Sequence, residues 1–110
     1  MTKKPDFVVM TTPSYQPIAN KAHKILQEAI VALSKLEIEA GHKHYAEDDA
    51  LDKEWDEHDD LDIEDKEHDE WWANRTARIK INTRMEHLYR DLHNIVSKLE
   101  SGLNAVEDYR

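Results

Sequence analysis

Acidic and aromatic residues gather in one short stretch of the sequence, and their order is nearly repeated there. The phrase DKEWDEH spans residues 52–58, and DKEHDEW spans residues 65–71, with Trp and His exchanged between the two copies. Carboxylates at this density can pair with basic surfaces, and tryptophan supplies the large contact area that charge alone lacks. The doubled phrase therefore indicates a surface for binding a cationic partner.

The charge of the chain is divided unevenly. Residues 47–70 hold 15 of the 24 acidic residues and only two basic ones, Lys53 and Lys66, for a net formal charge of −13. The remaining residues carry 13 bases and nine acids, a net of +4. If residues 47–70 were helical they would extend ~36 Å, with one carboxylate per ~2.4 Å of axis. Duplex DNA carries one phosphate charge per ~1.7 Å, so the segment has a charge density comparable to that of a nucleic-acid backbone.

In composition the segment resembles the small acidic DNA-mimic inhibitors carried by phages and mobile elements. The resemblance implies a partner that is a basic nucleic-acid-handling protein, and no direct binding of nucleic acid, which the acidic block would repel. We expect the binding residues to be the carboxylates and tryptophans of this region: Asp48, Asp49, Asp52, Glu54, Trp55, Asp56, Glu57, Asp59, Asp60, Asp62, Glu64, Asp65, Glu67, Asp69, Glu70, Trp71 and Trp72.

Two other kinds of chemistry have weaker signals. Glu39 and His42, and likewise Asp65 and His68, are spaced as carboxylate–histidine pairs are in helical di-iron sites, which gives a vague resemblance to ferritin-like proteins. Neither pair lies on an apolar helix face, so we assign no metal ligand and no cofactor. The chain has no cysteine and no glycine-rich phosphate loop, and its serines form no nucleophile motif. We expect a binding protein and not an enzyme.

Two apolar stripes predict the helices that must position the acidic segment. Each stripe recurs at intervals of three and four residues, the spacing of one helix face. The first, over residues 18–40, contains Ala22, Leu26, Ala29, Leu33, Leu36 and Ala40, and Ile18, Ile25 and Ile30 widen it. The second, over about residues 73–108, contains Ile81, Met85, Leu88, Leu92, Ile95, Leu99, Gly102, Val106 and Tyr109. The two segments are best buried by antiparallel packing against each other.

Helix-end signals predict where these elements begin and end. Pro17 suits the first turn of a helix, and Gly41 is expected to cap the C-terminus of the first helix. A separate short helix is expected from about Asp49 to His58, with Asp48 or Asp49 as its N-cap. A turn at residues 59–62 would lead into another helix that starts near Asp62. Because the turn separates the two copies of the phrase, Trp55, Trp71 and Trp72 could pack together and leave the carboxylates outside.

These observations predict an all-α fold: an antiparallel hairpin of two long, heptad-patterned helices, with a short acidic helix between them. Residues 1–16 are expected to form an extended arm, whose Phe7–Met10 run is bounded by Pro5 and Pro13, and residues 17–110 a single helical domain. The apolar stripes are wider than one seam can cover, so we expect a homodimer that forms a helical bundle. Without a signal peptide or membrane span, the expected location is the cytoplasm. The alternative function is a helical assembly or adaptor module with a solvated acidic face, and a further alternative is a ferritin-like helical metal-binding protein.

Overall fold

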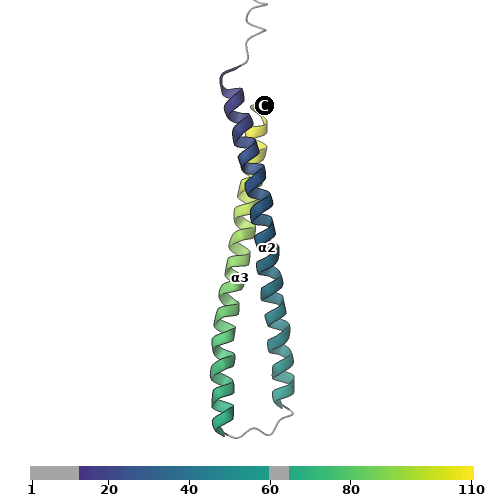
Figure 1. The fold of residues 1–110 in the computed structure, drawn as a ribbon, viewed down its shortest axis with the longest axis vertical. Helices are drawn as coiled ribbons and strands as arrows, with labels where there is room; N and C mark the ends of the chain where they lie inside the picture. Colours follow the sequence, from purple (N-terminus) through teal and green to yellow (C-terminus); the bar gives the residue numbers. More distant parts are fainter. Residues whose placement is uncertain (1–12, 60–64) are drawn as a thin grey trace, which may run out of the picture.

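Two long helices make up the described part of the computed structural model, which covers residues 13–59 and 65–110. Helix α2 spans Tyr15–Asp59 and helix α3 spans Asp65–Glu107. They lie side by side and antiparallel, and together they form a hairpin (Figure 1). The all-helical prediction and the antiparallel pairing are therefore confirmed. Residues 1–12 of the expected arm and residues 60–62 of the expected turn lie outside the described residues, whereas Tyr15 and Gln16 of the arm and Asp59 of the turn belong to α2.

The boundaries of α2 differ from the prediction. Pro17 lies in the first turn, as expected, but Gly41 does not end the helix. Gly41 lies inside α2, where a Cβ atom would approach Cε1 of Tyr89 to 3.0 Å. The glycine therefore makes room for an aromatic ring of α3, and this contact offsets the cost of ~1 kcal/mol that glycine brings to a helix interior. The prediction of a C-cap at Gly41 was wrong because sequence alone does not show the facing ring.

The prediction of a separate acidic helix from Asp49 to His58 was also wrong, because these residues form the last turns of the continuous α2. Asp48 and Asp49 are therefore interior helical residues and not N-caps. The second acidic copy lies at the start of α3, whose described residues begin at Asp65, and the predicted start near Asp62 lies outside the described residues. Both copies of the repeated phrase thus belong to the ends of long helices, and the hairpin carries its acidic residues at the end where α2 leads into α3 (Figure 1).

The interface between the helices follows intervals of three and four residues along each chain. On α2 the buried or half-buried positions include Ala19, His23, Leu26, Ile30, Leu33, Glu37, Ala40, His44, Glu47, Leu51, Glu54 and His58. On α3 they include His68, Trp71, Arg75, Arg78, Asn82, Met85, Tyr89, Leu92, Val96, Leu99, Leu103 and Val106. The seam is mainly apolar near the chain termini and mainly polar or aromatic near the acidic end.

The predicted apolar stripes coincide with this seam only at alternate positions. Leu26, Leu33, Leu92 and Leu99 lie at the interface, whereas Leu36 of α2 is 50% exposed. On α3 the remaining large stripe residues are exposed by 44–67%: Ile81, Leu88, Ile95 and Tyr109. The hairpin therefore leaves a substantial apolar surface uncovered.

Within the described residues, neither helix is long and apolar enough to cross a membrane.

Candidate partner-binding surface

The two copies of the repeated phrase meet across the hairpin as an aromatic cluster. His58 of the first copy stacks on Trp71 of the second, with ring centroids 3.8 Å apart and planes inclined by 10°. His58 also stacks on His68, at 5.0 Å. Trp55 packs against Trp71 at 6.2 Å and, edge to face, against Trp72 at 5.5 Å. The expected packing of the three tryptophans is confirmed, and it ties the acidic ends of α2 and α3 together.

Polar contacts hold this cluster in one arrangement. The indole N–H of Trp72 donates a hydrogen bond to Nε2 of His68, at 2.6 Å. The guanidinium of Arg75 lies 5.2 Å and 5.5 Å from the ring centroids of Trp55 and Trp71, within the range of cation–π attraction. The same guanidinium donates to the backbone carbonyl of Leu51 at 2.7 Å. Arg75 therefore links the aromatic cluster to the backbone of α2.

One turn further from the cluster, Arg78 holds two carboxylates of the acidic segment. It donates to both oxygens of Glu54, at 2.8 Å and 2.6 Å, and it pairs with Glu47 through its other terminal nitrogen. These hydrogen bonds, to Glu47 first and to Glu54 second, raise the pKa of Arg78 above its already high ordinary value. Stability from a raised pKa is fully present below the ordinary value, so this contribution stays constant across the physiological pH range.

A buried polar layer follows next along the seam. Asn82, 6% exposed, donates to Asp48 at 2.7 Å and accepts from Nδ1 of His44 at 3.1 Å. The other ring nitrogen of His44 faces Asp48 at 3.5 Å and Glu86 at 3.9 Å. Because these polar groups satisfy one another only in this alignment, the layer favours one register of α2 against α3.

The carboxylates that point away from the seam form what we call the acidic face. Its described members are all exposed: Asp49, Asp52, Asp56, Glu57, Asp69 and Glu70. Asp49, Asp52 and Asp56 follow one side of α2 at intervals of three and four residues, which places them about 4.5 Å and 6 Å apart along the axis. They form no ion pair with other described residues. A cationic partner would find these groups solvated and fixed on a long helix.

The 17 predicted binding residues thus have different positions in the structure. Asp48 accepts a hydrogen bond from Asn82, and Glu54 pairs with Arg78. Trp55, Trp71 and Trp72 build the aromatic cluster, in which Trp55 and Trp72 are still 38% and 37% exposed. Six carboxylates make up the acidic face. The other six lie outside the residues whose side chains are described: Asp59, Asp60, Asp62, Glu64, Asp65 and Glu67.

The prediction missed the residues that fix this surface in place. Arg75, Arg78 and Asn82 lie on the interface side of α3, before most of the residues of the predicted apolar stripe. These residues continue the spacing of three and four residues shown by Met85 and Tyr89. This spacing was the feature of the sequence that could have placed them at the interface. The spacing shows which side they occupy, but their acidic partners are visible only once the register is known.

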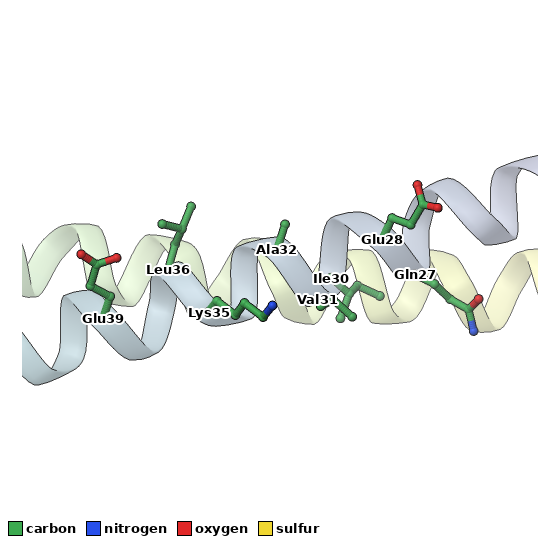
Figure 2. Close-up of a pocket in the computed structure, with 8 residues that line it drawn as sticks. All are labelled: Gln27, Glu28, Ile30, Val31, Ala32, Lys35, Leu36 and Glu39. Carbon is green, nitrogen blue, oxygen red and sulfur yellow. The ribbon is translucent and has the colours of Figure 1, made fainter.

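The other surface features of the hairpin are weaker candidates for a binding site. A shallow depression along α2 is lined by apolar and charged side chains of that helix alone, and Figure 2 shows Glu28 and Glu39 extending to one side of the helix while Lys35 runs along it. Glu39 forms an ion pair with Lys43 at 3.3 Å and both Glu39 and His42 are exposed. Among the described residues there is no group of three or more histidines and carboxylates placed to hold a metal ion.

No family model, curated protein or solved structure matches this chain.

Proposed function

We propose that the protein binds a basic, nucleic-acid-handling protein through its acidic face and occupies the surface that otherwise holds the phosphate backbone. The supporting observation is the row of exposed carboxylates at residues 49, 52 and 56, carried on a continuous helix. Their axial spacing of about 4.5–6 Å is of the same order as the ~3.4 Å rise per phosphate along one DNA strand. The acidic face would act as an inhibitor of nucleic-acid binding, in the cytoplasm, by occupation and without catalysis.

The contacts behind the acidic face support this function energetically. Self-repulsion within a segment of net charge −13 would favour a loose, extended chain. The Arg78 ion pairs and the aromatic cluster oppose that repulsion by joining α2 to α3. A pre-ordered surface loses less conformational entropy when it binds. The exposed edges of Trp55 and Trp72 would add an apolar contact beside the carboxylates.

A second candidate function is that of a helical assembly module. The observation that favours it is the row of large apolar side chains left exposed on both helices, including Ile18 and Ile25 of α2 and Ile81 of α3, which are 65–68% exposed. Only four apolar residues of the described chain are buried, and each is still 5–7% exposed: Ala19, Ala40, Leu51 and Val96. Self-association as a homodimeric helical bundle would cover these side chains, and it is compatible with binding through the acidic face.

Affinity capture tests the proposed function. The full-length protein is immobilised and exposed to a lysate of the cells that carry it, at low and at moderate salt. We expect it to retain a basic protein that itself binds DNA or RNA, with retention falling steeply as salt rises, since the contacts are ion pairs with a highly charged surface. Retention that is insensitive to salt, or of proteins with no affinity for nucleic acid, would favour the assembly module.

A further inference from the structure

Six large exposed apolar side chains of the two helices lie along one edge of the hairpin, whereas others, among them Val31, Ile38 and Ile79, lie outside it. Contacts between the helices define the opposite edge, where Trp55 meets Trp72 and Asn20 meets Arg110. On α3, the residues seven positions or a multiple of seven after Trp72 follow this opposite edge. On α2, the residues seven positions or a multiple of seven before Trp55 follow it. A side chain two residues further along either helix is rotated by about 200° around the helix axis. It therefore lies on the other side of the seam.

This rotation assigns a common position to six of the exposed apolar residues, which together we call the apolar edge. On α3 it consists of Ile81, Leu88 and Ile95, each seven residues from the next and 44–67% exposed. On α2 it consists of Leu36, which is 50% exposed, and, on the adjacent helical row, of Ile18 and Ile25. Ala22, Ala29 and Ala32 fill the spaces between them. Figure 2 shows Ala32 and Leu36 on the side of α2 away from Val31.

The apolar edge ends where the acidic segment begins. Ile81, its last large residue on α3, lies beside Lys43 and Glu47 of α2 in a small surface hollow. Beyond that level α2 continues for residues 47–59, about 20 Å of helix, with carboxylates on its outward side. The hairpin is therefore divided along its length into an apolar part near the chain termini and an acidic part at the other end.

We propose that a second copy of this chain covers the apolar edge, in an antiparallel dimer whose two acidic ends project from opposite ends of a four-helix bundle. This inference rests on the self-association proposed above and specifies its surface and orientation. Each of the six large side chains would bury roughly 100 Å². Together they give roughly 600 Å² per copy before the alanines are counted, close to the ~800 Å² per partner of a stable interface.

Charge selects the orientation. A parallel dimer would place two segments of net charge −13 beside each other, whereas an antiparallel dimer separates them by the whole bundle. An overlap centred near residue 30 of α2 pairs the apolar edges over most of their length and leaves residues 47–59 of each copy free. The dimer would thus present two acidic faces, one at each end, to two basic partners.

The oligomeric state and one distance test this inference in the full-length protein. Wild type is expected to have a dimer mass by light scattering. The double variant Ile25→Asp/Ile81→Asp is expected to be monomeric with unchanged helix content, its dissociation constant raised at least ~100-fold, because both side chains are already exposed in the single hairpin. The matched control is Ile38→Asp/Ile79→Asp, which places the same charges on exposed isoleucines outside the apolar edge and should stay dimeric.

Orientation is read from a spin label at Lys53→Cys, which is specific because the chain has no cysteine. The antiparallel dimer predicts a separation of about 70 Å between the two labels, since each lies some 23 residues from the centre of overlap. A parallel dimer predicts about 20–25 Å, two helix diameters. A short distance, or loss of the dimer in the control variant, would overturn the inference. A monomeric wild type would overturn self-association itself and point to another occupant of the apolar edge, such as residues 7–10. The proposed role of the acidic face would then still be tested by affinity capture.

Discussion

Changing Asp49, Asp52 and Asp56 together to lysine should abolish binding of the captured basic partner, with the dissociation constant raised at least ~100-fold. These three residues form the regular row of the acidic face on α2, and reversing them replaces attraction by repulsion along the whole row. Each single reversal should change the affinity only a few-fold, because each carboxylate is one exposed contact among many. Isothermal titration calorimetry against the purified partner measures the effect.

A matched control separates location from overall charge. Asp91, Glu100 and Asp108 are also exposed, and they lie on or beside α3 far from the acidic end. Their joint change to lysine alters the net charge by the same amount and should change the affinity no more than a few-fold. Far-UV circular dichroism should show equal helix content for both triple variants. Equal losses of binding in the two variants would mean that net charge, and not the acidic face, controls the interaction.

Substituting Arg78 by methionine should lower the free energy of unfolding by about 1–3 kcal/mol, the largest stability effect expected from a surface-reaching residue of this hairpin. The substitution keeps much of the side-chain volume but leaves Glu47 and Glu54 close together without their shared cation. Arg78 is 26% exposed and the two glutamates are 33% and 39% exposed, so solvent reduces the effect below that of a fully buried pair. Urea denaturation followed by circular dichroism measures the change.

Two further variants identify the cause. Arg84→Met removes an exposed arginine of the same helix and should change the free energy of unfolding by less than about 0.5 kcal/mol. The triple variant Arg78→Met/Glu47→Leu/Glu54→Leu removes the stranded carboxylates as well and should recover most of the lost stability. If Arg84→Met were as destabilising as Arg78→Met, the loss of positive charge alone would explain the effect.

The hairpin was predictable because its two apolar patterns are long and regular. The exact seam was not, since each pattern is wider than one interface. Leu26 and Leu33 belong to the seam, whereas Leu36 belongs to the apolar edge, and periodicity alone does not separate them. Polar residues take the intervening seam positions because they find partners on α3: Glu37 pairs with His93 at 2.6 Å, and His23 with Glu107 at 2.6 Å.

The acidic end was predicted in its packing but not in its helical continuity. Facing copies of one phrase on two antiparallel helices explained why Trp55, Trp71 and Trp72 meet. Gly41 suggested a helix end because glycine commonly ends helices, and its role beside Tyr89 depends on a contact 48 residues away in the chain. Arg78 was missed for the same physical reason: an ion pair across a seam depends on register, which local patterns do not determine.

Competition between this protein and nucleic acid for the partner shows whether the acidic face occupies the phosphate-binding surface. A fluorescent DNA or RNA duplex bound by the captured partner is titrated with this protein, and the anisotropy of the duplex is followed at fixed salt. If the acidic face occupies the phosphate-binding surface, the duplex should be released completely, and the variant carrying lysine at positions 49, 52 and 56 should fail to release it. Formation of a ternary complex, in which the partner holds the duplex and this protein at once, would show that the acidic face does not occupy the phosphate-binding surface.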